Sequence, residues 1–229
     1  MTTFVLVHGA YQGGWIWRDV AAALRAAGQH VLTPTLDGCA ERQPQLRAGI
    51  TTETQAEELA GLLFYEDLRD VVLVGTSSGG MVLCAAAERA RERIGRLVFA
   101  DALALFDGER IGDIVTNRPA QVTTALSVGP SREDAAGRLF SGLDAATRDW
   151  ALERYTLHPI ACMQAPVRLE RFWNESWDAS VIWCRHSANP PVAHQRRTAD
   201  TLQARWLELD TGHYPMLSMP AELTRLITA

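Results

Sequence analysis

Short runs of β-branched and aliphatic residues alternate in this chain with longer segments rich in alanine, leucine, arginine and glutamate. This alternation is typical of strands connected by helices that pack on both faces of a parallel sheet. The pattern predicts strands over residues 3–8, 30–35, 71–75, 96–101, 180–185 and 205–209, and helices over 17–27, 52–64, 78–91, 192–203 and 221–228. We therefore expect an α/β fold with a mostly parallel sheet of about six strands flanked by helices.

Residues 103–178 interrupt this alternation. They contain helical segments and large apolar side chains, but no convincing strand of the main sheet. A long segment that leaves and rejoins the carboxyl edge of a parallel sheet lies where ligands bind in such folds. We predict one domain over residues 1–229 with residues 103–178 as an inserted cap. About two or three of the cap aromatics should line a pocket, and the others should form the core of the cap; the seven are Phe106, Phe140, Trp150, Tyr155, Phe172, Trp173 and Trp177.

The composition excludes several classes of function. A net charge of -5 gives no basic surface for nucleic acid. The chain contains no lysine, which excludes Schiff-base chemistry and a P-loop. The four cysteines form no CxxC pair, so we expect buried apolar thiols and no zinc site or disulfide framework. The start MTTFVLVHGA resembles a first strand more than a signal peptide, and no apolar run is long enough for a membrane span. The prediction is a cytoplasmic protein with no membrane partner.

Six residues, Gly75-Thr76-Ser77-Ser78-Gly79-Gly80, connect the predicted strand 71–75 to the helix that follows. A G-x-S-x-G sequence between a strand and a helix predicts a nucleophile elbow, a tight turn that holds a serine hydroxyl above the sheet at the positive end of a helix. Ser77 is the central serine and the predicted nucleophile. Ser78 is expected to contribute its backbone N–H.

His8, Gly9 and Ala10 follow the first predicted strand. Glycine at position 9 lets the backbone turn close to the elbow, so that the N–H groups of Ala10 and Ser78 can form an oxyanion hole. Gly9 and Tyr11 are further candidates for contact with substrate. We expect His8 to anchor this loop through hydrogen bonds rather than to take part in chemistry.

His213 lies between the last predicted strand and the last predicted helix, in the sequence LDTGHYPMLSMPAEL. It is the predicted general base, because the loop after the last strand returns to the elbow. Four other histidines are expected to be solvated or structural: His30, His158, His186 and His194.

Three motifs carry a family resemblance that runs from residue 3 to the end and is weakest in the cap: the segment GAYQGGWIW from Gly9, the elbow, and GHYPMLS from Gly212. Together they resemble the small α/β-hydrolases that include plant methylesterases, salicylate-binding esterases and hydroxynitrile lyases. The lyases of this group have threonine at the position of Gly9 and lysine at the position of Tyr214. The resemblance therefore implies an esterase and disfavours a cyanohydrin lyase.

The chain departs from the family at the acid that orients the base. The resemblance places an aspartate in the loop after strand 180–185, and this chain has Ser187 there. Asp101 is one substitute, because some lipases of this fold carry the acid one strand earlier; it is equally open that Asp101 only braces the cap entrance. Ser187 or Asn189 is a second substitute, as a neutral hydrogen-bonding partner of His213. Asp210 is a third, although its position favours a tether for the loop.

These alternatives leave three candidate functions. The leading prediction is a serine hydrolase that cleaves an ester, thioester or lactone of a small apolar carbonyl compound, with no metal ion or organic cofactor. A weakened base at His213 with Ser187 as partner would instead suit a lyase or cyclase in natural-product biosynthesis. A non-catalytic binder of small molecules is the third alternative. The sequence does not decide the oligomeric state, and a homodimer is one option.

Overall fold

The computed structural model of the protein describes residues 1–115 and 120–229. Six strands form one sheet in the order β2-β1-β3-β4-β8-β9, and every neighbouring pair is parallel. Their bounds are β1 Thr3–Val7, β2 His30–Leu32, β3 Val71–Ser77, β4 Ile94–Ala102, β8 Ala179–Cys184 and β9 Arg205–Leu209. The predicted parallel α/β sheet is confirmed. The largest boundary error is at β2, which ends at Leu32 rather than at residue 35.

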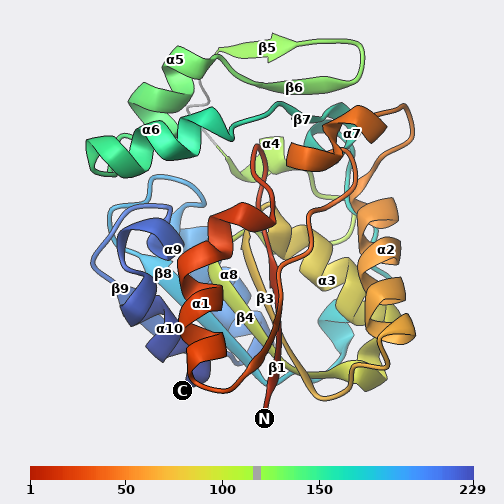
Figure 1. The fold of residues 1–229 in the computed structure, drawn as a ribbon. Coiled ribbons are helices and arrows are strands. Elements are labelled where there is room, and N and C mark those ends of the chain that lie inside the picture. Colours follow the sequence, from red (N-terminus) through yellow and green to blue (C-terminus); the bar gives the residue numbers. More distant parts are fainter. Residues whose placement is uncertain (116–119) are drawn as a thin grey trace.

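Helices cover both faces of this sheet (Figure 1). One face packs against α1 and α10, and the other packs against α2, α3 and α8. Their bounds are α1 Arg18–Ala26, α2 Thr52–Tyr65, α3 Gly79–Arg89, α8 Val192–Leu202 and α10 Pro220–Thr228. Short elements complete this layer: η1 Gly14–Trp17, η2 Ala40–Gln45, η3 Arg91–Arg93 and α9 Pro215–Ser218. Within the described residues, no helix has the length and apolar character needed to cross a bilayer.

The buried run in β3 shows how the sequence fixes this layered arrangement. Val71 and Leu73 point into the core beneath α2 and α3, whereas Val72 and Val74 point into the core beneath α1 and α10. Successive side chains of a strand point to opposite faces, so a strand covered on both faces is apolar at every position. The strand order also reverses at β1, because the chain runs from β1 to β2 on one side and then to β3 on the other. Ligands bind at such a reversal, beyond the carboxyl ends of the strands.

The insertion between β4 and β8 lies beyond those carboxyl ends, on the side of the sheet opposite the chain termini (Figure 1). Its described residues contribute no strand to the main sheet, but they form a separate antiparallel sheet of β5, β6 and β7, which was not predicted from the sequence. The bounds in the insertion are α4 Ile111–Ile114, β5 Gln121–Thr123, β6 Ser127–Pro130, α5 Arg132–Asp134, η4 Ala135–Leu139, α6 Ala145–Glu153, β7 His158–Pro159, α7 Ile160–Gln164 and η5 Phe172–Asn174. These strands are too short to show a period-2 pattern, which explains the error.

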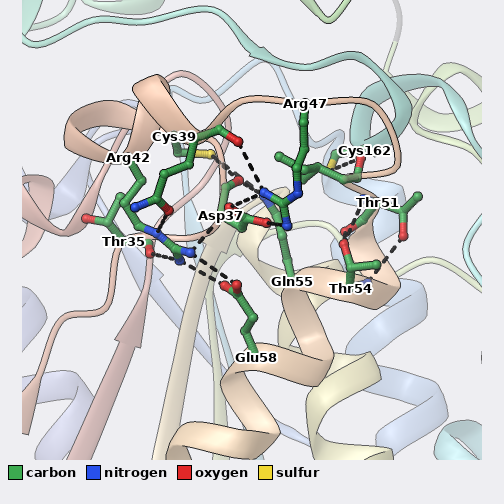
Figure 2. Close-up of polar contacts among 12 residues, drawn as sticks. Thr35, Asp37, Cys39, Arg42, Arg47, Thr51, Thr54, Gln55, Glu58 and Cys162 are labelled. Atoms are coloured by element: carbon green, nitrogen blue, oxygen red, sulfur yellow. Dashed lines mark hydrogen bonds and ion pairs between the residues drawn. The ribbon is translucent and has the colours of Figure 1, made fainter.

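A buried carboxylate fixes the segment between β2 and α2 (Figure 2). Asp37 is 2 % exposed and pairs with Arg42 at 3.2 Å and Arg47 at 2.7 Å. Arg42 also pairs with Glu58 of α2 at 2.8 Å, and the Gln55 side chain donates to the Asp37 carbonyl at 2.8 Å. The same segment contacts the insertion, since Cys39 Sγ lies 3.5 Å from His158 Nδ1 and the Ala40 N–H donates to Thr156. This ion-pair network therefore supports one side of the insertion.

Candidate active site

Ser77 ends β3 in a turn so tight that its φ is +50°, in the left-handed region that residues with a Cβ rarely adopt. Such a conformation costs about 1–3 kcal/mol and persists where the surrounding structure enforces it. A Cβ at Gly79 would collide with the His8 carbonyl, and one at Gly80 would collide with the Leu103 carbonyl. Glycine at both positions lets α3 start directly against the ends of β1 and β4. The predicted strand-turn-helix geometry of the elbow is present.

The loop after β1 lies against the elbow. A Cβ at Gly9 would come within 2.6 Å of the Ser77 Cβ, so a side chain at position 9 would displace the serine. His8 Nδ1 donates to the Gly9 carbonyl at 2.7 Å, and the Leu36 N–H donates to His8 Nε2 at 3.0 Å. Complete burial lowers the pKa of His8 to about 4, so the imidazole is neutral. The structural role predicted for His8 is confirmed.

Ala10 and Ser78, the two residues predicted to supply backbone amides, lie beside Ser77. Both residues line the same cavity as Ser77, and Ser78 stands at the N-terminus of α3. Throughout residues 1–115 and 120–229, neither amide donates a hydrogen bond to another group of the protein. Free N–H groups at a helix N-terminus are favourable for negative charge.

His213 follows β9, and its side chain meets the carboxylate at the end of β4. His213 Nδ1 donates to Asp101 Oδ2 across 2.6 Å, and the Asp101 side chain is completely buried. The competing hydroxyl of Ser187 lies 3.5 Å from the same nitrogen and donates to the Asn189 carbonyl at 3.0 Å. Hydrogen bonds to a carboxylate are stronger and shorter than neutral ones. Asp101 is therefore the main partner of His213, and Ser187 is secondary.

Sheet order explains how two candidate partners, one acid and one hydroxyl, reach one histidine. Strands β4 and β8 are neighbours, with Ala100 beside Ile182, so the end of β4 and the loop after β8 both open beside His213. Asp210 is directed elsewhere, because it accepts from His186 Nε2 at 3.0 Å at an exposed position.

Gln195 of α8 holds the second oxygen of Asp101, a contact that the sequence analysis missed. Its Nε2 donates to Asp101 Oδ1 at 2.7 Å, and the Cys184 N–H donates to the same oxygen at 3.3 Å. Gln195 is completely buried, and a buried carboxylate needs such hydrogen-bond donors to replace the water it has lost. Asp101 also has a φ of +49°, which aspartate tolerates better than most residues. The only available signal in the sequence was a glutamine on the buried face of a predicted helix.

A second buried glutamine ties the loop after β1 to the loop that carries His213. Gln12 Oε1 accepts from the Gly9 N–H at 3.3 Å, and the Gln12 side chain also hydrogen-bonds the side chain of Tyr214. The Tyr214 ring packs against His213 with the ring centroids 4.9 Å apart, and burial raises the pKa of Tyr214 above its usual range. These contacts were also missed, because they join residues about 200 positions apart in sequence.

One cavity of about 260 Å³ is lined by Ser77, Ser78, Ala10, Tyr11, Ser187 and His213. Gly9 and Asp101 lie behind this lining, against Ser77 and His213 respectively. The rest of the wall is mainly aliphatic and includes Leu103, Ile111, Val115, Leu139 and Met163. All predicted site residues other than Asp210 thus gather around one small apolar cavity, and within the described residues no cluster of His, Cys, Asp or Glu is arranged to hold a metal ion.

The expectation that some cap aromatics line this cavity is wrong. Of the described residues in its wall, none is one of the seven aromatics named above. They pack instead on one another and on the core, as in the Phe172–Trp177 stack at 5.2 Å and the Phe106–Trp173 edge contact at 4.6 Å. Large aromatic rings stabilise the fold most when they are fully buried, and aliphatic side chains are therefore left to line the cavity.

Two further histidines resemble His8 in being buried and in having a lowered pKa. Burial lowers the pKa of His158 to about 3 and that of His194 to about 4. Both lie inside the fold, where His158 contacts Cys39 and the Ala104 N–H donates to His194 Nε2. The four cysteines are free and buried, as predicted.

These three histidines predict loss of stability in mild acid. The unfolded chain binds protons at histidine below about pH 6.5, whereas the folded chain does not until about pH 4. Lowering the pH from 6.5 to 5.5 should therefore reduce the free energy of unfolding by about 3 kcal/mol in total. Urea unfolding at a series of pH values measures this. His158→Asn should weaken the dependence, and the same change at exposed His186 should not; equal slopes in both variants would contradict the prediction.

Comparison with known proteins identifies the family of this chain. Residues 4–226 match the model of the alpha/beta hydrolase family. The chain is 31% identical to the carbendazim hydrolyzing esterase of Nocardioides sp. (strain SG-4G), covering 100% of this chain and 99% of that protein. It is 33% identical to putative methylesterase 12, chloroplastic, of Arabidopsis thaliana, over 98% of this chain and 70% of that protein.

Solved structures show the same fold. An extracellular alpha/beta-hydrolase from a Paenibacillus species has a TM-score of 0.84 at 21% identity, covering 100% of this chain and 98% of that one. Polyneuridine aldehyde esterase, as its H244A mutant, has a TM-score of 0.81 at 22% identity, covering 99% and 98%. The chain belongs to the alpha/beta hydrolase family. Within that family it is an esterase-like hydrolase of the branch that contains the methylesterases.

Proposed function

We propose that the protein is a serine hydrolase that cleaves a carboxylic ester, thioester or lactone of a small apolar molecule. The observation that carries this proposal is the 2.6 Å hydrogen bond from His213 Nδ1 to the buried carboxylate of Asp101. A carboxylate at this position fixes the imidazole tautomer with Nε2 free to accept a proton, and it stabilises the imidazolium that forms. Ser77, His213 and Asp101 would then act as a catalytic triad, with the acid one strand earlier than the family resemblance implies.

The first half of the reaction acylates the enzyme. Ser77 Oγ attacks the substrate carbonyl carbon while His213 Nε2 accepts its proton. The N–H groups of Ala10 and Ser78 donate to the carbonyl oxygen as it becomes negative, and such a donor is worth about 3–4 kcal/mol. His213 then gives the proton to the departing alkoxide oxygen of an ester or lactone, or to the departing thiolate sulfur of a thioester, and the acyl group stays on Ser77.

The second half releases the acid. Water gives a proton to His213 and adds to the acyl carbon, and the proton returns to Ser77 Oγ as the ester bond breaks. Gln195 would act as a positioning residue, because it donates to the Asp101 oxygen that does not face His213. We also propose that residues 103–178 act as a cap that limits access of bulk water, since several of them line the cavity. No step needs a metal ion or an organic cofactor, and the cytoplasmic location stays a prediction.

The lyase or cyclase alternative rested on a neutral partner for His213. Ser187 lies within 3.5 Å of Nδ1 but is the weaker of two partners, which favours hydrolysis. Close packing of Gly9 against Ser77 also leaves no space for the threonine of hydroxynitrile lyases. A binder without activity would need neither the strained turn at Ser77 nor a base aligned by a buried acid, so it is the weakest alternative.

Covalent labelling tests the proposal directly. A fluorophosphonate should modify Ser77 in stoichiometric amount, because the base and the two amides activate this serine. Hydrolysis of a small methyl ester in heavy-oxygen water should place one solvent oxygen in the acid product. Turnover without solvent oxygen in the product would support the lyase or cyclase alternative. Absence of both labelling and turnover would support the binder.

A further inference from the structure

Arg138 is the one permanently charged side chain among the described residues that line the cavity at Ser77. It lies in η4 of the insertion, next to Leu139, in a wall that is otherwise apolar or neutral apart from His213. Ligand sites of this kind use a few placed polar groups to select among apolar molecules of similar shape. A lone cation in such a wall predicts selection by charge.

Most hydrogen-bond donors of the Arg138 guanidinium are available to bind a ligand. Among the described residues the guanidinium makes one ion pair, which joins Nε to Asp134 Oδ1 at 3.5 Å, with the two side chains 59% and 32% exposed. Asp134 also accepts from the hydroxyl of Ser131 at 3.1 Å. Over residues 1–115 and 120–229, the terminal nitrogens of Arg138 have no carboxylate or carbonyl partner. An exposed pair of this length contributes little, so an incoming carboxylate can bind the planar fork of the guanidinium.

Arg138 also lines a second hollow of about 560 Å³ that has His213 in its wall as well. The two cavities share Leu139, Ser187, Ala188 and His213 in their walls. The wall of the second hollow has a larger polar share than that of the first and includes Ser141, His186, Asp210, Thr211 and Ser218. Its one acid, Asp210, already pairs with His186 at 3.0 Å. Arg138 therefore lies where the walls of a mainly apolar cavity and of a more polar one meet.

Resting on the proposed function, we infer that the preferred substrates are esters that carry a second, ionised carboxylate, such as monoesters of aliphatic dicarboxylic acids. The apolar chain fills the cavity beside Leu103 and Met163, and the ester carbonyl lies at Ser77. The free carboxylate reaches the boundary between the cavities and binds Arg138. Arg138 is thus a specificity-determining residue, which discriminates by charge and not by the shape of the apolar chain.

Pairs of esters that differ only in whether one carboxylate is free test the effect of its charge. Monomethyl adipate and monomethyl suberate carry the free carboxylate, and dimethyl adipate and dimethyl suberate have the same chains without it. The wild-type protein should show a lower KM for at least one monoester than for its diester. Arg138→Gln should raise that KM about fivefold with kcat little changed, and should leave the diester KM unchanged. Added salt should likewise raise only the monoester KM.

Arg132→Gln is the matched control, because Arg132 lies on the same insertion and lines a separate hollow. It should leave both KM values as they are. An equal effect of Arg138→Gln on both esters, or no effect on either, overturns the inference. A protein that reacts with fluorophosphonate at Ser77 but hydrolyses only diesters, or none of the four esters, also overturns it while the proposed function stands. A protein that neither labels nor hydrolyses contradicts the proposed function itself.

Discussion

Replacing Ser77 with alanine should lower kcat for ester hydrolysis by about 10⁶-fold, the loss expected when a triad nucleophile is removed. The backbone amides of Ala10 and Ser78, which form the proposed oxyanion hole, stay in place, so a residual acceleration of about 10³–10⁴ over water should persist. Labelling by fluorophosphonate should disappear. Single-turnover kinetics on a sensitive chromogenic ester measures both rates.

This variant should fold normally, because a φ of +50° has the same conformational free-energy cost for alanine as for serine. Ser77→Gly relieves that strain, so it should be equally inactive and more stable to heat than Ser77→Ala. Ser78→Ala should lose far less activity, because it removes a hydroxyl and keeps the backbone amide. A Ser77→Ala protein with more than about one-hundredth of wild-type kcat would show that another group is the nucleophile.

Local patterns in the sequence were sufficient for the sheet and the elbow. The run Val71-Val72-Leu73-Val74 is apolar at every position because β3 is covered on both faces, and this is visible without coordinates. The glycines after Ser77 can likewise be recognised from the local sequence, since a tight strand-helix turn needs them wherever it occurs. His213 was found because the loop between the last strand and the last helix returns to the elbow.

The acid and the cavity wall depend on contacts between distant residues. Asp101 and Ser187 both follow strands that end beside His213, and the choice between them needed the distances 2.6 and 3.5 Å to Nδ1. Gln195 had no motif, because its role depends on where α8 crosses the end of β4. Cap aromatics such as Phe140 and Phe172 were misplaced because composition cannot tell a ring in a core from a ring in a pocket.

Asp101→Asn should lower kcat/KM by about 10⁴-fold. Asparagine tolerates the φ of +49° as well as aspartate does, and its amide oxygen can still accept from Gln195. Its NH₂ group would then face His213 Nδ1 and donate to it. That hydrogen bond selects the tautomer with the proton on Nε2, which cannot accept the proton of Ser77. The fold should survive while the base fails, and kcat/KM with thermal unfolding of the same sample measures both.

A second carboxylate beside His213 should restore part of this loss. Ser187 Oγ already lies 3.5 Å from Nδ1, so Ser187→Asp in the Asp101→Asn background places a new acid in the loop after β8. The double variant should recover about tenfold or more of the lost kcat/KM, since the charge returns although the geometry is not optimised. Asp210→Asn should change kcat/KM by less than about tenfold, because that carboxylate pairs with His186. Near-normal activity in Asp101→Asn, or a large loss in Asp210→Asn, would contradict Asp101 as the catalytic acid. The partner of His213 would then have to lie in the loop after β8 or the loop after β9.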